Sequence, residues 1–213
     1  MLDIDLELSA LDYHLKLLEE HIKNKTAFER LLLQKKIDDL RLSPDDPDWQ
    51  YLHQEFYHLE DFLLPRLFRV PFLVSLYAVY ESAVIEIASN IQKQKGITIS
   101  INDLRGDFLE RAKKYFKGII DFKLCSDRAW QKITMLSVLR NAIAHANGRM
   151  EMLKIEIKTK IKTWEKQKVG VPTVDGFVVV DEGFTRETLS LVSSSLNDLV
   201  ERYKNWDDNL VSA

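Results

Sequence analysis

The stretch LRNAIAHANG, residues 139–148, brings an arginine, an asparagine and a histidine together near what its sequence predicts to be the end of a helix. The closing Asn-Gly pair favours a helix C-terminus, because both residues tolerate the left-handed backbone conformation. On a helix, Asn141 and His145 lie on one face, one turn apart, while Arg140 lies about 100° round the axis from Asn141. The three polar groups therefore cannot all point into one apolar core.

His145 and Arg140 supply two groups that phosphodiester cleavage needs. An imidazole titrates near neutral pH and can move a proton, and a guanidinium can hold a phosphate as negative charge builds up. We expect Asn141 to position the histidine or the phosphate. RNA carries its own nucleophile in the 2′-hydroxyl, so this reaction requires no metal or other cofactor. The plainer alternative is that Asn141 and His145 cap or cross-link helices and that Arg140 pairs with a surface acid.

The motif Arg140-Asn141-x-x-x-His145, followed by Ala-Asn-Gly, resembles the R-N-x4-6-H-type signature of the HEPN superfamily, which includes toxin-type and abortive-infection ribonucleases. Upstream residues extend the likeness: Trp130-Gln131-Lys132-Ile133, Leu136 and Leu139. The resemblance covers residues 73–148 best and residues 1–65 hardly at all. It implies an all-α fold, an up-and-down helical bundle of the HEPN type, to which this chain adds a small C-terminal β-hairpin.

The same resemblance implies a function and partners. We expect a metal-independent endoribonuclease of a toxin–antitoxin or anti-phage defence system, with RNA as substrate and an antitoxin or defence-system protein as a further partner. A single histidine cannot easily serve as acid and base on opposite sides of the phosphate, which favours a homodimer that doubles the site around one cleft. The alternative is a non-catalytic HEPN-like protein that binds RNA or nucleotides or acts as a scaffold.

The composition fits one helical domain. The chain has 213 residues, of which 46% are hydrophobic and 30% charged, with only 7 glycines and 5 prolines. This scarcity of turn-forming residues favours long helices over a sandwich of strands. We expect a single domain over residues 1–213, with a helical extension over residues 1–65 and a core over residues 71–206. The formal net charge is −3, so an RNA site has to be a local basic patch.

Several features predict a cytoplasmic protein. Cys125 is the only cysteine, which excludes an internal disulfide and a multi-cysteine zinc site and fits a reducing compartment. Residues 1–5 lack the basic and apolar regions of a secretory signal. Residues 70–80 form the most apolar run, which is too short to span a membrane.

Apolar spacing predicts helices through the first half of the chain. The first forty residues form a helix or a helix pair with an apolar stripe: Leu11, Leu15, Leu18 and Ile22, continued by Phe28, Leu31 and Leu32. The two prolines of residues 43–48 predict a break, and a second helix starts at Trp49. Pro65 and Pro71 interrupt the chain, and Pro71 opens a central helix that ends at Gly96. Its predicted core face is Leu73, Leu76, Tyr80, Ala83, Val84, Ile87 and Ile91.

The second half adds a short helix over residues 106–115, a helix from Ser126 or Asp127 that carries the motif, and a last helix capped by Thr185. Residues 149–168 show both strand and helix spacing, and their length and helix-forming residues favour a helix. Asp175-Gly176, flanked by β-branched residues, predicts a hairpin turn.

Other charged residues are candidates to support the site. Glu81 lies at the edge of the apolar face of the central helix, either as a partly solvated boundary carboxylate or as a group that orients Arg140 or His145. Four basic residues are candidate RNA-backbone contacts: Lys132, Arg149, Lys154 and Lys158. A solvated helix face is the alternative explanation for the lysines that follow the motif.

Overall fold

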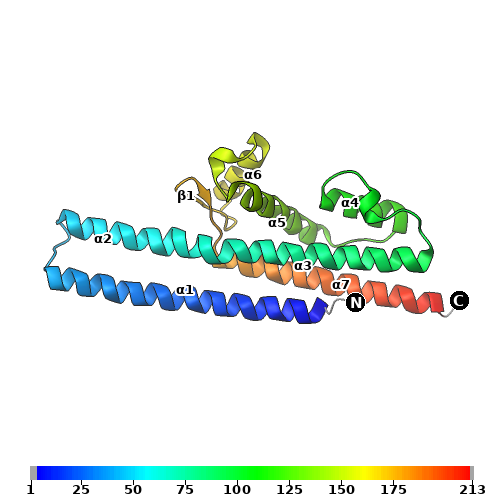
Figure 1. The fold of residues 1–213 in the computed structure, drawn as a ribbon, viewed down its shortest axis with the longest axis horizontal. Helices are drawn as coiled ribbons and strands as arrows, with labels where there is room; N and C mark the ends of the chain where they lie inside the picture. The colour runs from blue at the N-terminus through cyan, green and yellow to red at the C-terminus, as the bar shows by residue number, and fades with distance from the viewer. Residues whose placement is uncertain (1–3, 212–213) are drawn as a thin grey trace. The chain divides into compact units, whose positions relative to one another are not determined.

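The computed structural model describes residues 4–211, with side chains as far as Asn205, and it is mostly helical (Figure 1). The α-helices are α1 (Ile4–Leu40), α2 (Pro47–His58), α3 (Leu64–Lys95), α4 (Phe108–Tyr115), α5 (Asp127–Ala146), α6 (Ile155–Lys166) and α7 (Glu182–Val211). Leu59–Leu63 (η1) and Phe116–Ile120 (η3) are π-helical, and Ile101–Asp103 (η2) and Met150–Met152 (η4) are 3-10 turns. Strands β1 (Thr173–Val174) and β2 (Phe177–Val178) form one antiparallel sheet. The predicted all-α class with a small hairpin is confirmed.

Backbone packing divides the described chain into two compact units. Unit 1 contains residues 4–12, 74–141 and 186–211, and unit 2 contains residues 13–73 and 142–185. The boundaries fall inside helices, so neither unit coincides with the predicted extension over 1–65 or the predicted core over 71–206. The single-domain organisation stays a prediction.

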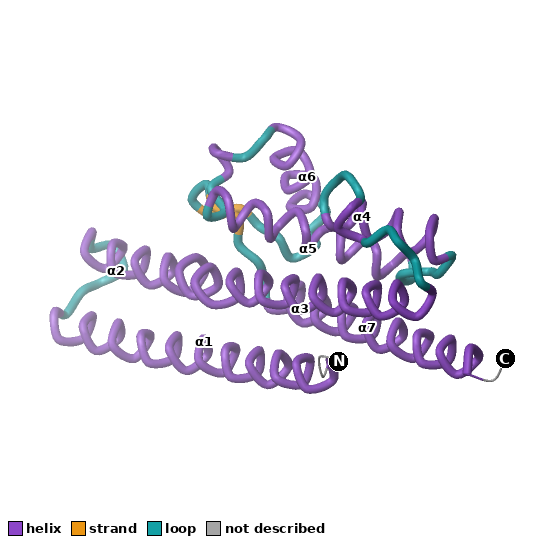
Figure 2. Tube along the Cα trace, turned by 45° about the vertical axis from the view of Figure 1, so that its right-hand side comes forward, coloured by secondary structure: helices purple, strands orange, loops and turns teal. Residues whose placement is uncertain are grey.

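The core of unit 1 lies on the apolar faces of α3, α5 and α7. The predicted face of α3 is buried as far as Ile91, and Ile133, Leu136 and Leu139 of α5 are fully buried. Gln94 Nε2 donates a 3.1 Å hydrogen bond to the Tyr203 hydroxyl, and α7 runs alongside α3 within this unit (Figures 1 and 2). The 3.6-residue period thus predicted which residues of α3 and α5 are buried.

Unit 2 contains an antiparallel pair formed by α1 and α2, joined by residues 41–46 (Figure 1). The break was predicted over residues 43–48, and α2 begins two residues before the predicted start at Trp49. Leu15, Leu18 and Ile22 are buried as predicted, and the buried Glu19 carboxylate accepts two 2.8 Å hydrogen bonds from Arg69. The predicted continuation of the stripe is wrong: Phe28, Leu31 and Leu32 are 54%, 70% and 45% exposed. Towards its C-terminus α1 is therefore covered on fewer sides than apolar spacing alone suggests.

The prolines do not interrupt the chain as predicted, since α2, η1 and α3 form one continuous helical stretch from Pro47 to Lys95. A proline removes one helical hydrogen bond, and its ring crowds the carbonyl four residues earlier. Pro65 is the second residue after the π-helical turn η1, and Asp61, the residue four before it, belongs to that wider turn. Pro71 is itself exposed, and its neighbours Val70 and Phe72 are buried, so packing holds the helix together there.

Because the helix is continuous, it contains an 18-residue window with a mean hydropathy of 1.5, of which 44% is buried inside the structure. By length and composition this window satisfies the criteria for a membrane span. The core helix of a water-soluble protein satisfies the same criteria, so one such window is weak evidence that this helix crosses a membrane.

The hairpin forms where Asp175-Gly176 predicted it. Both turn residues have positive φ angles, 49° and 77°, as a two-residue type I′ turn requires. Val178 N–H donates to the Gly148 carbonyl at 2.9 Å, and Arg149 forms a bridge with Phe177, which fastens the hairpin to the end of α5.

Two helix boundaries were predicted wrongly, one on each side of the hairpin. The helix predicted over residues 149–168 is shorter, because the 3-10 turn η4 precedes α6. The last helix begins at Glu182 and is capped by Asp181, whose Oδ1 accepts a 2.7 Å hydrogen bond from Phe184 N–H. The predicted cap, Thr185, is a buried residue inside the helix, and its hydroxyl donates to the Asp181 carbonyl.

Candidate functional site

The end of α5 is fixed by backbone hydrogen bonds. Asn147 and Gly148 have φ angles of 50° and 72°, and Gly148 N–H donates to the Ala142 carbonyl at 3.1 Å. This bond joins residues six positions apart, and together with the 2.8 Å bond from Asn147 N–H to the Ile143 carbonyl it satisfies carbonyl groups that the helix end leaves free. A Cβ atom at position 148 would lie at an ordinary contact distance of 3.5 Å from the Val178 carbonyl oxygen, so the positive φ angle is the reason for glycine there. The predicted helix terminus is confirmed.

His145 lies in the last turn of α5, in unit 2, and its side chain is exposed. Among the described residues it makes no hydrogen bond, ion pair or ring contact. No contact of the His145 side chain therefore supports helix capping, the alternative explanation for this histidine. Its imidazole is therefore accessible to solvent and to a bound molecule.

Arg140 and Asn141 lie in unit 1, and the two side chains bond to each other. Arg140 Nη1 donates to Asn141 Oδ1 at 2.9 Å, and the guanidinium lies 5.5 Å from the centre of the Tyr77 ring. The Tyr77 hydroxyl in turn accepts a 3.2 Å hydrogen bond from Ser137. Asn141 therefore orients the arginine here, and its role towards the histidine or a phosphate stays a prediction.

Glu81 is half-buried on α3, close to the same tyrosine. Burial raises the pKa of Tyr77, the hydrogen bond from Ser137 lowers it, the Glu81 charge raises it and the Arg140 charge lowers it. No ion pair joins Glu81 to Arg140 among the described side chains. The predicted supporting carboxylate thus lies in the electrostatic surroundings of Arg140 without binding it.

The four basic residues predicted to contact RNA fall into different environments. Lys132 is buried, and its ammonium donates to Glu187 at 2.7 Å, which is the first cause of the lowered pKa of Glu187. A paired, buried lysine does not offer a free charge to RNA. Lys154 is exposed just before α6, whereas Lys158 is half-buried and donates to the Glu151 carbonyl at 2.9 Å.

Arg149 belongs to a group in unit 2 that the sequence did not reveal, here called the Phe177 cluster: Arg66, Arg149, Phe177, Phe62, His58 and Asp175. The Phe177 ring has two guanidinium groups near it, that of Arg66 at 4.4 Å and that of Arg149 at 5.5 Å from its centre. Phe62, from the π-helical turn η1, lies 5.5 Å from Phe177, centre to centre. Arg66 is more than a hundred residues from Phe177 in sequence, so no local motif predicted this contact.

His58 and Asp175 complete the cluster. His58 Nδ1 lies 3.0 Å from Asp175 Oδ2, and the imidazole packs 4.9 Å from the Phe62 ring. Both side chains are exposed. The pair ties the hairpin turn to the end of α2, and it is an ion pair only when the histidine is protonated.

A search of the described side chains finds no group of three or more His, Cys, Asp or Glu residues placed to hold a metal ion. Comparison of the chain with family models, with curated proteins and with solved structures gives no significant match.

Proposed function

We propose that this protein is an RNA-cleaving enzyme of the HEPN type, with His145 as the proton-transferring residue. The observation that carries the proposal is the exposed His145 without a partner, held at a capped helix end four residues before Arg149. Arg149 and Arg66 share the Phe177 ring in the same unit, which supplies positive charge and an aromatic surface. RNA is bound through both kinds of contact, since its phosphates pair with arginine and its bases stack on aromatic rings and guanidinium planes.

In the proposed mechanism the 2′-hydroxyl attacks the adjacent phosphorus and the 5′-oxygen leaves. The products are a 2′,3′-cyclic phosphate and a 5′-hydroxyl. His145 accepts the proton from the 2′-hydroxyl or donates one to the leaving oxygen. Arg140, oriented by Asn141, binds the phosphate and stabilises its additional charge. A homodimer would supply the second proton-transferring group.

We further propose a cytoplasmic role in a toxin–antitoxin or anti-phage defence system, with an antitoxin or another protein of that system as partner. The motif resemblance and the composition support this setting.

The Phe177 cluster also favours a second candidate function, an RNA-binding module without catalysis. Two arginines aligned on one ring can bind a strand without any proton transfer.

Purified protein incubated with mixed RNA in EDTA separates the two functions. We expect cleavage products with cyclic phosphate ends for the wild type and none for His145→Ala. His14→Ala, which removes another exposed histidine of unit 2, is the matched control and should cleave normally. RNA binding without cleavage by the wild type would replace the enzyme with the binding module.

A further inference from the structure

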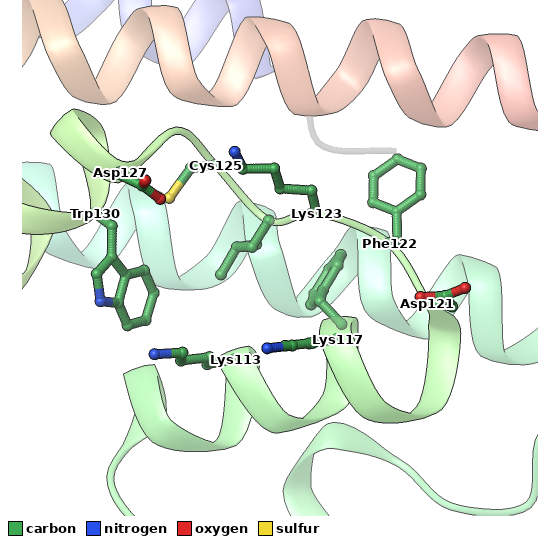
Figure 3. Close-up of a pocket in the computed structure, with 10 residues that line it drawn as sticks. Lys113, Lys117, Asp121, Phe122, Lys123, Cys125, Asp127 and Trp130 are labelled. Carbon is green, nitrogen blue, oxygen red and sulfur yellow. The ribbon is translucent and has the colours of Figure 1, made fainter.

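Unit 1 contains a cavity of about 600 Å³ between α4 with η3, the loop that follows them, and the first turn of α5 (Figure 3). This volume lies within the range of about 300–1,000 Å³ that is usual for small-molecule sites. All ten lining residues lie within residues 113–130, and none belongs to the proposed RNA-cleaving site.

Three aromatic rings and three lysines give the cavity its chemistry. Trp130 and Phe122 are half-buried and Phe116 is buried, so flat apolar surfaces form much of the wall. In Figure 3, Lys113 and Lys117 lie on the helix that forms one wall of the cavity. Trp130 lies on the facing wall, and its ring points towards the two lysines. Lys113 Nζ lies 5.5 Å from the centre of the Trp130 ring. A flat molecule on the indole would therefore come close to a positive charge.

The lysine charges are not neutralised by ion pairs. Among the described residues no hydrogen bond or ion pair engages the ammonium groups of Lys113, Lys117 and Lys123. Asp121 and Asp127 also line the cavity, so three positive charges face two negative ones. This balance suits a ligand with one anionic group, because the aspartates repel a polyanion, and their oxygens can accept hydrogen bonds from an amino group.

Residues that do not line the cavity position the loop that forms one of its walls. The Arg202 guanidinium, on α7, donates to the backbone carbonyls of Lys123 and Leu124 and lies 5.1 Å from the centre of the Phe122 ring. Asp198 orients Arg202 through hydrogen bonds of 2.8 and 3.1 Å. On the other wall, η3 is a π-helical turn, a feature frequent at functional sites. A site formed in advance loses less free energy on ordering when a ligand binds.

We propose that this cavity binds a small planar aromatic molecule that carries one anionic group and an amino group. The ring packs against Trp130 and Phe122, the anion pairs with Lys113 and Lys117, and Asp127 accepts a hydrogen bond from the amino group. An aromatic amino acid has this chemistry, and so does a nucleoside monophosphate whose base carries an amino group, such as AMP.

Isothermal titration calorimetry of the full chain tests the proposal with four probes: tryptophan, AMP, adenosine and inorganic phosphate. We expect tryptophan or AMP to bind at least tenfold more tightly than adenosine, which lacks the anion, and than phosphate, which lacks the ring. Which of the two binds identifies the source of the ligand. If phosphate binds as tightly as tryptophan and AMP do, or if none of the four probes binds, the proposal is overturned.

Variants locate the binding. The double variant Lys113→Gln/Lys117→Gln should weaken the best probe at least tenfold. Lys162→Gln/Lys166→Gln is the matched control, because these exposed lysines of α6 have the same spacing, and it should bind as the wild type does. Arg202→Met should weaken binding through loss of the loop contacts, with the fold checked by circular dichroism. Unchanged binding by the folded Lys113/Lys117 double variant would place the ligand elsewhere and refute the proposed site.

Discussion

The arginines of the Phe177 cluster in unit 2 and two lysines of unit 1 use their positive charges differently. In unit 2, Arg66 and Arg149 lie against one phenylalanine ring, Arg66 half-buried and Arg149 exposed, whereas unit 1 buries Lys132 against Glu187 and places Lys113 beside a tryptophan in a cavity. A guanidinium that stacks on a ring keeps N–H groups free for a phosphate. A paired lysine has used its charge for the fold, and a lysine in a cavity meets only molecules that fit there. This difference is the reason for proposing a polymer as the ligand of unit 2 and a small molecule as the ligand of unit 1.

The largest expected effect tests whether unit 2 acts chemically. His145→Ala should lower the RNA cleavage rate by about 100-fold or more, since a positioned acid or base contributes 10²–10⁴-fold. The exposed imidazole makes no contact with the described residues, so the unfolding midpoint should stay at the wild-type value. The rate is measured under single-turnover conditions and the midpoint in urea. A large fall in stability with unchanged cleavage would make His145 structural.

A smaller effect is expected from the arginines of the Phe177 cluster. Arg66→Ala/Arg149→Ala should weaken RNA binding by about tenfold, and for two lost phosphate contacts the slope of log affinity against log salt should fall by about 1.4. Fluorescence anisotropy with a labelled single-stranded RNA at several salt concentrations measures both quantities.

Arg30→Ala is the control for this pair of substitutions. Arg30 also lies over a phenylalanine ring, 5.4 Å from the centre of Phe56, but it is paired with Glu60 at 3.3 Å. It should leave RNA binding unchanged. An equal loss in the control would show that any surface arginine of unit 2 contributes, and the comparison between the units would lose its basis.

The sequence predicted what local interactions decide. The helix period predicted the buried faces of α3 and α5, and the Asn147-Gly148 and Asp175-Gly176 pairs predicted a helix end and a turn, because these conformations depend on neighbouring residues. Pro65 was misjudged because a π-helical turn before it makes room for its ring.

The features that the sequence did not predict depend on long-range contacts. The burial of Lys132 depends on Glu187, and the placing of Arg66 depends on Phe177, and both pairs are distant in sequence. The motif gave the position of His145 on its helix. It gave no information on which arginines share the unit of His145, since Arg140 lies five positions before it and Arg149 four positions after it.

The Lys132–Glu187 pair allows a smaller test in unit 1. Glu187→Gln leaves a buried ammonium without its carboxylate, so we expect the free energy of unfolding to fall by about 1 kcal/mol, a value reduced by the partial exposure of Glu187. Glu201→Gln removes the carboxylate of an exposed pair on the same helix and should change stability by less than about 0.5 kcal/mol. Urea unfolding at neutral pH measures both changes. Equal effects would mean that Lys132 needs no partner.

The smallest expected effect is the pH dependence of the difference in unfolding free energy between the wild type and Glu187→Gln. Lys132, and then Arg128, hold the pKa of Glu187 below its ordinary value in the folded protein, so the stabilisation is present at neutral pH and is lost as pH falls through the folded-state pKa. Glutamine does not titrate, and all other groups are common to both proteins. The difference in unfolding free energy between wild type and Glu187→Gln should therefore narrow as pH falls from about 7 to about 3, across the ordinary glutamate pKa. A difference that stays constant or widens would show that the stabilisation lost in Glu187→Gln does not depend on the carboxylate charge, and the contrast between a paired lysine and free cations would lose its electrostatic basis.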